Sequence, residues 1–196
     1  MQVVLATANP DKAREIAAIL APAGIELLPR PDDVAEVDET GDTLVENAEL
    51  KAVAIATATG LAAVADDTGL FVDALDGAPG VFSARYAGQH ATYADNVAKL
   101  LDALSTTSGP RSARFETAAV LVGPQDQLVV ALGAMHGVIA TSPRGTNGFG
   151  YDPVFVPDDA DGRTLAELSD DEKHAISHRG RAFRELAELL ETAARE

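Results

Sequence analysis

Residues Leu61–Leu75, LAAVADDTGLFVDAL, decide the fold class. Two apolar runs, Leu61–Ala65 and Leu70–Leu75, flank the acidic tetrapeptide Asp66-Asp67-Thr68-Gly69. Short apolar runs bounded by turn residues are typical of buried strands, so we expect two strands joined by an acidic turn. Acidic side chains where a buried strand ends are typical of active sites in α/β enzymes. A solvated turn is the alternative interpretation of the same residues.

Helices and strands are mixed along the rest of the chain, which predicts an α/β or α+β fold. Helices are expected where a capping residue precedes an apolar face, at 10–20, 43–59, 92–104, after Ser169 and at 179–194. Further strands are expected at Val3–Ala6, Ile25–Leu28, Arg114–Val122, Leu128–Leu132, Met135–Ala140 and Val154–Val156. No repeat or linker interrupts the pattern, so we expect a single domain over residues 1–196.

The composition, 46% hydrophobic and 23% charged, is that of an ordinary soluble protein. No apolar run approaches the roughly 20 residues that span a bilayer, and the N-terminus lacks the basic stretch of a secretory signal. The absence of cysteine excludes a thiolate nucleophile and fits a cytoplasmic location. The net charge of −16 argues against binding a nucleic acid polymer, which requires a basic face. A small phosphorylated ligand needs only local positive charge.

The segment Thr7-Ala8-Asn9-Pro10-Asp11-Lys12 has the features of an anion site. It lies between a predicted strand and a helix N-terminus, where free N–H groups and the helix dipole favour an anion. Lys12 adds a full positive charge. A capped helix with a solvated lysine is the alternative, and the Walker pattern G-x-x-x-x-G-K-[ST] is missing.

Glu39 lies in an acidic loop before the second predicted helix, which carries Lys51. With Asp66 and Asp67, Glu39 offers the carboxylates that Mg²⁺ takes while keeping water and phosphate in its other positions. Taken singly, Glu39 and Lys51 are also typical of a solvated surface.

The glycine-rich segment Gly148-Phe149-Gly150-Tyr151-Asp152 suits close approach to a flat ligand such as a base, which stacks on aromatic rings. Entry of both aromatic side chains into the core is the alternative. Ser177-His178-Arg179-Gly180 follows Lys173 by a few residues. We reject a catalytic triad because G-x-S-x-G is missing and adjacent Ser and His do not easily form a nucleophile–base pair. His178 and Arg179 are better interpreted as donors to a polar ligand.

Taken in order, these segments resemble the Ham1-like family of inosine/xanthosine triphosphate pyrophosphatases. The matching motifs span nearly the whole chain: Thr7–Lys12, Glu39-Thr40-Gly41, Glu46-Asn47-Ala48, Ala65–Leu70, Gly77–Gly80, Ser83–Tyr86, Gly148–Pro153 and Ser177–Gly180. Ala8 departs from the pattern, because the family usually has Gly or Ser there.

The resemblance implies an α/β fold whose mixed twisted sheet is flanked by helices, two lobes with a nucleotide cleft between them, and a homodimer. It also implies Mg²⁺-dependent hydrolysis of the purine nucleoside triphosphates ITP, dITP and XTP to the monophosphate and pyrophosphate. Asp67 would be the general base, and Glu39 with Asp67 would hold the metal. The triphosphate would contact Thr7, Ala8, Asn9, Pro10, Asp11, Lys12, Lys51 and Thr68. The base and sugar would contact Phe149, Gly150, Tyr151, Asp152, Lys173, His178 and Arg179.

Two other functions remain open at this point. A Maf-like pyrophosphatase would act on modified pyrimidine or guanine nucleotides instead. A non-catalytic nucleotide-binding module would keep Lys12 and Phe149 but would have little need for the carboxylates of Asp66 and Asp67.

Overall fold

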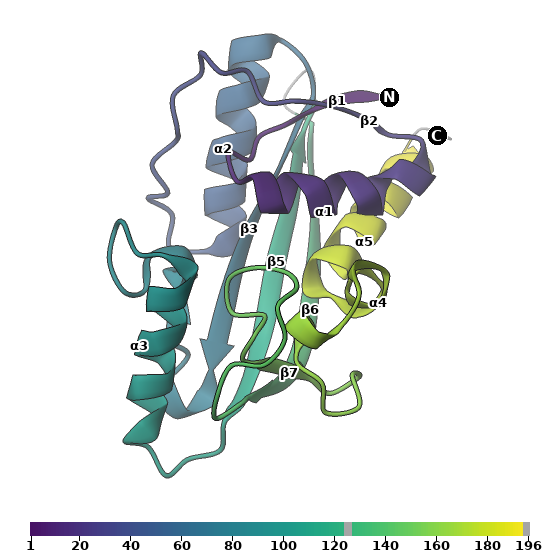
Figure 1. Cartoon of the computed structure of the whole chain (residues 1–196). Helices are drawn as coiled ribbons and strands as arrows, with labels where there is room; N and C mark the ends of the chain where they lie inside the picture. The colour runs from purple at the N-terminus through teal and green to yellow at the C-terminus, as the bar shows by residue number, and fades with distance from the viewer. Residues whose placement is uncertain (124–126, 194–196) are drawn as a thin grey trace. The chain divides into compact units, whose positions relative to one another are not determined.

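Figure 1 shows the computed structural model of the protein, which describes residues 1–123 and 127–193. The helices are α1 (Pro10–Leu20), α2 (Leu44–Thr59), α3 (Tyr93–Ser105), α4 (Asp170–Ile176) and α5 (His178–Ala193). The strands are β1 (Gln2–Leu5), β2 (Glu26–Leu28), β3 (Ala63–Val72), β4 (Pro79–Gly80), β5 (Ser112–Val122), β6 (Leu128–Ile139) and β7 (Phe155–Pro157). The predicted end of the last helix at Ala194 lies outside the described residues.

The strands follow the order β2-β1-β3-β5-β6-β7, with β4 paired to β3. β1 pairs in parallel with both β2 and β3, whereas β3–β4 and β6–β7 are antiparallel pairs. The sheet is therefore mixed, and together with the helices it confirms the predicted α/β class.

The chain forms two compact units, in agreement with the two lobes that the resemblance implies. Unit 1 comprises the described residues of Met1–Asp67, Thr117–Gly133 and Arg179–Glu196, and unit 2 comprises Thr68–Glu116 and Ala134–His178. The core of unit 1 joins apolar side chains of α1 and α5 with those of β1 and β3. The core of unit 2 joins side chains of α3 with those of β5, β6 and β7.

The acidic turn predicted at Asp66–Gly69 is wrong, because β3 continues through these residues. Asp66 and Asp67 are only 1% and 6% exposed. Both carboxylates meet cations inside unit 1, so the strand does not have to turn to expose them to water. The glycine in the tetrapeptide permits close packing: a Cβ on Gly69 would lie 2.9 Å from the carbonyl oxygen of Gly80 on β4.

A second correction concerns β6, which is one strand where two were predicted at Leu128–Leu132 and Met135–Ala140. The helix starts were predicted well. Asn9 caps α1, and Thr43 and Ser169 form the predicted capping boxes of α2 and α4. Within the part of the chain that the structure describes, no helix is both long enough and apolar enough to cross a bilayer.

Candidate active site

β3 directs its two adjacent carboxylates to opposite faces, because successive side chains of a strand alternate. Asp66 lies on the face of Val64, which packs in the core formed with α1 and α5. Asp67 lies on the other face and contacts α2. Unit 1 therefore holds two ion-pair clusters: the Asp66 cluster (Lys12, Glu15, Asp66 and Arg179) and the Asp67 cluster (Glu39, Asn47, Lys51 and Asp67).

In the Asp66 cluster, a single carboxylate oxygen is the meeting point of two cations. Oδ2 of Asp66 lies 3.1 Å from Nζ of Lys12 and accepts hydrogen bonds from Nε and Nη2 of Arg179 at 3.2 and 3.1 Å. Arg179 also donates from Nη1 to Glu15, at 2.5 Å. The guanidinium, predicted to contact the base and sugar, is thus buried among residues of unit 1 with Lys12.

The electrostatics of this cluster keep Asp66 ionised. Burial alone would raise the pKa of its carboxyl group, but the charges of Lys12, Arg179 and Lys51 outweigh burial and hold the pKa below its usual range. Burial lowers the pKa of Lys12, and the neighbouring charges of Lys51 and Arg179 add to this against the attraction of Asp66. The two cations of the cluster, Lys12 and Arg179, are thus balanced by the two carboxylates of Glu15 and Asp66.

In the Asp67 cluster, one ammonium group lies between two carboxylates. Nζ of Lys51 donates to Oε1 of Glu39 at 2.8 Å and to Oδ1 of Asp67 at 3.2 Å. The amide of Asn47 reaches Oδ2 of Asp67 at 3.5 Å, and its oxygen accepts a hydrogen bond from the backbone of Gly41 at 2.8 Å. Asn47 thereby ties the loop that carries Glu39 to α2.

The pKa values of Asp67 and Lys51 are both raised, but for different reasons. Burial, together with the charges of Glu39 and Asp66, raises the pKa of Asp67 against the attraction of Lys51 and Lys12. Burial alone would lower the pKa of Lys51, but Asp67, Asp66 and Glu39 together raise it. Lys51 is thus a firmly charged cation.

The donor set of the Asp67 cluster fits a divalent cation. Carboxylate oxygens of Glu39 and Asp67 already converge on one positive centre, the ammonium of Lys51. Mg²⁺ is commonly bound in this way, by one or two carboxylates with water and phosphate completing its shell. Asp66 does not join them, because it faces Lys12 and Arg179. Among the described residues, no group of three or more His, Asp or Glu side chains forms a metal site by itself.

The segment Thr7–Lys12 is organised around the cap of α1. The side chain of Asn9 accepts hydrogen bonds from the backbone N–H groups of Asp11 and Lys12, at 2.9 and 3.3 Å, and Thr7 accepts one from the backbone of Asn9 at 3.1 Å. Ala8 and Pro10 are exposed. At the predicted anion site, Asn9 therefore caps the backbone N–H groups of Asp11 and Lys12. The positive charge of the segment comes from the side chain of Lys12.

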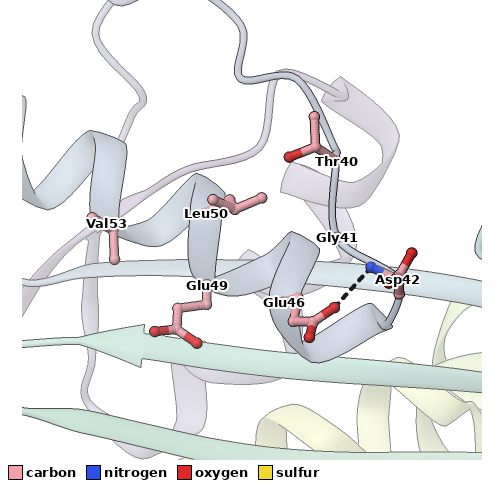
Figure 2. A pocket seen from close by; sticks show the side chains of 7 residues that line it. All are labelled: Thr40, Gly41, Asp42, Glu46, Glu49, Leu50 and Val53. Carbon is pink, nitrogen blue, oxygen red and sulfur yellow. Dashed lines mark hydrogen bonds between the residues drawn. The ribbon is translucent and has the colours of Figure 1, made fainter.

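A pocket of about 440 Å³ in unit 1 is formed by α2 and the loop before it. Figure 2 shows its lining: Thr40, Gly41, Asp42, Glu46, Glu49, Leu50 and Val53. Glu46 belongs to the helix cap and accepts a hydrogen bond from the backbone of Asp42. Three carboxylates and no cation line the pocket, so it is unsuited to phosphate.

In unit 2, the predicted base-binding loop is held together by one carboxylate. Asp152 accepts a hydrogen bond from the backbone of Phe149 at 2.8 Å and another from Nζ of Lys173 at 2.5 Å. The same ammonium lies 4.9 Å from the centre of the Phe149 ring, a cation–π contact. Phe149, Asp152 and Lys173 thus form one connected group.

Gly148 offers a test of how this loop is built. Its φ is +72°, and a Cβ there would lie 2.0 Å from Oδ2 of Asp152. Gly150 has a similar φ of +63° but nothing within 4 Å of its Cβ position. We expect Gly150→Ala to lower the free energy of unfolding by roughly 1–2 kcal/mol through backbone strain alone. Gly148→Ala adds a steric clash and should cost more, as measured by chemical unfolding of both variants. Equal losses would contradict the packing described for Gly148.

Two other predicted site residues of unit 2, Tyr151 and His178, are buried, and a third is partly buried. Tyr151 is buried and its hydroxyl donates to the carbonyl of Ser83 at 2.9 Å; burial raises the pKa of that hydroxyl. His178 is also buried, and its ring stacks on Phe115 with a centroid separation of 4.6 Å. Thr68 is half-buried on β3.

Sequence reasoning missed two residues of the clusters in unit 1. Glu15 is a buried acid on α1, and its only signal is its spacing of three residues from Lys12 next to the buried Ile16. Asn47 lies in a matching motif, but nothing in its position indicated that its side chain bridges Gly41 and Asp67.

Comparisons with known proteins show the family of the chain. A family model described as the Ham1 family matches residues 3–189. A protein of Streptomyces avermitilis named dITP/XTP pyrophosphatase is 50% identical over 194 residues, which cover 96% of each chain. A protein of the same name from Shigella flexneri is 47% identical over 194 residues, covering 96% of this chain and 98% of that one.

Solved structures give the same result. A HAM1 protein from Coxiella burnetii superposes with a TM-score of 0.89 at 44% identity, covering 98% of this chain and 99% of that one. Sequence and structure therefore agree over almost the full length, and the chain belongs to the Ham1 family.

Proposed function

We propose that this protein hydrolyses noncanonical purine nucleoside triphosphates (ITP, dITP and XTP) to the nucleoside monophosphate and pyrophosphate, and so removes them from the nucleotide pool. The observation that carries the proposal is the Asp67 cluster, in which the ammonium of Lys51 lies between the carboxylates of Glu39 and Asp67. The names of the relatives from Streptomyces avermitilis and Shigella flexneri, dITP/XTP pyrophosphatase, support the same substrate class.

The reaction is an attack of water on the α-phosphorus of the nucleotide. The bond from this phosphorus to the oxygen that bridges the β-phosphate breaks, and pyrophosphate leaves. Asp67 accepts the proton of the attacking water. Lys12 and Lys51 offset the negative charge that grows on the leaving pyrophosphate, and Thr7–Asp11 and Thr68 position the triphosphate.

The charges in unit 1 support a metal requirement. Four carboxylates, those of Glu15, Glu39, Asp66 and Asp67, accompany three cations, those of Lys12, Lys51 and Arg179. The two clusters together are thus net negative, which opposes a triphosphate. Mg²⁺ bound by Glu39 and Asp67 would reverse that balance and neutralise charge on the phosphate oxygens.

Phe149, with Gly150, Tyr151, Asp152 and Lys173, is proposed to bind the base and sugar, together with His178 and Arg179. The ring of Phe149 supplies a stacking surface, supported by its contacts with Lys173. Donors aimed at the 6-oxo group of hypoxanthine or xanthine would reject the 6-amino group of adenine, because buried donors would then lose their partners.

A substrate panel tests the proposal. With Mg²⁺, purified protein should release pyrophosphate, and no orthophosphate, from ITP, dITP and XTP, and much less from ATP. Chelation of the metal with EDTA should stop turnover, and added Mg²⁺ should restore it. Failure to cleave any of the three substrates would refute the function. A preference for modified pyrimidine nucleotides would indicate a Maf-like activity, and a tight complex without turnover would indicate a binding module.

We further propose that the whole chain, residues 1–196, forms one pyrophosphatase domain that works as a homodimer in the cytoplasm. Light scattering in solution tests the dimer directly: a mass near twice 20.3 kDa is expected, and a mass near 20.3 kDa would contradict it.

A further inference from the structure

A second aromatic residue, Tyr93, contacts the ring of Phe149. The two ring centroids lie 5.7 Å apart, and the ring planes are inclined at 40°. This separation and tilt fall within the range of favourable aromatic pairs. Tyr93 belongs to α3, far in sequence from the loop of Phe149, and neither the predicted site residues nor the motifs of the family resemblance include it.

The position of Tyr93 is fixed by the start of its helix. Tyr93 is the first residue of α3, directly after the capping residue Thr92. Thr92 and Asp95 form a capping box, in which each side chain accepts a hydrogen bond from the backbone of the other residue, at 3.2 and 2.8 Å. The ring of Tyr93 therefore projects from a rigid support.

Phe149, in contrast, lies in a loop, and the orientation of its ring depends on contacts with other residues. It is flanked by Gly148 and Gly150, both with positive φ. A glycine can adopt more backbone conformations than any other residue. Asp152 holds the backbone of Phe149, and its ring has Lys173 and Tyr93 as partners. Two elements of unit 2, α3 and α4, thus supply side chains that orient one ring.

The contact is not part of the hydrophobic core. Tyr93 is 43% exposed, whereas the core aromatics Phe115 and Phe155 are 6% and 0% exposed. The ring of Tyr93 is thus held against the proposed stacking residue near the surface of unit 2, where the contact orients the ring of Phe149.

We propose that Tyr93 is a positioning residue for substrate binding, which holds the ring of Phe149 in place for stacking of the purine base. This inference rests on the proposed function. A ring that is already ordered loses less conformational freedom when the base binds. The same contact is made in the ground state and in the transition state, so its loss raises KM and leaves kcat unchanged.

The test compares Tyr93→Ala, Tyr93→Phe and Phe149→Ala, with Phe82→Ala as the matched control. Phe82 is another exposed aromatic of unit 2, 58% exposed, whose ring contacts Arg85. Tyr93→Ala should raise KM for ITP by about 2- to 12-fold, the range expected for an aromatic pair, with kcat unchanged. Tyr93→Phe should keep the wild-type KM because the ring is retained, and Phe82→Ala should behave as wild type.

A double variant decides whether Tyr93 acts through Phe149. In the Phe149→Ala background, Tyr93→Ala should have no further effect on KM, because the ring that it positions is gone. Additive effects of the two changes would overturn the proposal. So would a KM for Tyr93→Ala equal to that of wild type, or a Tyr93→Phe variant as impaired as Tyr93→Ala.

Calorimetric titration with IMP separates this inference from the proposed function. IMP carries the base and sugar and needs no turnover, so its Kd should change across the variants as KM does. If wild-type protein fails to cleave ITP but binds IMP, and Tyr93→Ala weakens that binding, the proposed function fails and the role of Tyr93 stands. An unchanged Kd for Tyr93→Ala, or wild-type protein that does not bind IMP, overturns the role of Tyr93.

Discussion

Asp67→Asn is expected to reduce kcat for ITP by at least about 1,000-fold. A general base alone contributes roughly 10²–10⁴-fold, and this substitution also removes a charged ligand of the proposed metal. The amide has the shape of the carboxylate but neither accepts the proton of the attacking water nor carries its charge. Steady-state release of pyrophosphate from ITP measures the loss, and a rate near that of wild type would remove Asp67 from the role of base.

The fold should survive this change, because Lys51 keeps its second carboxylate partner, Glu39, at 2.8 Å. Circular dichroism and thermal unfolding check that expectation. Glu49→Gln is the matched control: it also removes one negative charge from unit 1, but from the acidic pocket of Figure 2, and should leave kcat unchanged.

Glu39→Gln should lower kcat for ITP, and added Mg²⁺ should partly restore the rate. Added Mg²⁺ should not restore the rate of Asp67→Asn.

Local signals in the sequence were enough to place the helices. A capping residue and its partner are separated by only three residues, so the caps at Asn9, Thr43 and Ser169 are visible in the sequence itself. The same local rules failed at Asp66–Gly69. Asp, Thr and Gly favour turns, but long-range ion pairs bury both carboxylates and the strand continues.

The sequence did not indicate which residues pair with one another in the Asp66 and Asp67 clusters. Arg179 and Asp66 are separated by 113 residues, and no periodicity relates them. The family resemblance implies that Arg179 contacts the base and sugar, and no pattern in the sequence indicated that its guanidinium also contacts Asp66 and Glu15. The chemistry of the residues was visible, but which carboxylate meets which cation depends on how α1, α5 and β3 pack.

The second large effect concerns stability. Asp66→Ala should lower the free energy of unfolding by about 3–5 kcal/mol, because removing one partner of a buried ion pair leaves uncompensated charge behind. Lys12 and Arg179 would both lose the oxygen on which they converge, and Arg179 is only 2% exposed. For a chain of this length the loss corresponds to a fall in Tm on the order of 10 °C.

Asp73→Ala is the matched control, since Asp73 directly follows β3 and also pairs with an arginine. That pair, with Arg114 at 3.9 Å, is exposed, and the side chain of Asp73 is 57% accessible. Exposed pairs contribute about 0–1 kcal/mol, so this variant should unfold almost as wild type does. If both variants lost the same free energy of unfolding, the buried ion pairs of Asp66 would contribute no more to stability than the exposed pair of Asp73.

The pH dependence gives the same prediction an independent check. The pKa of Asp66 is lowered in the folded protein, against an ordinary value of 3.8. A carboxyl group with a lowered folded pKa stabilises the fold fully above its unfolded pKa, and this contribution is lost as pH falls toward the folded value. The gap in unfolding free energy between wild type and Asp66→Ala should therefore be constant near neutral pH and shrink below about pH 4. A gap that grows with acidification would contradict an ionised Asp66 in the fold, because a protonated carboxyl group could not hold Lys12 and Arg179.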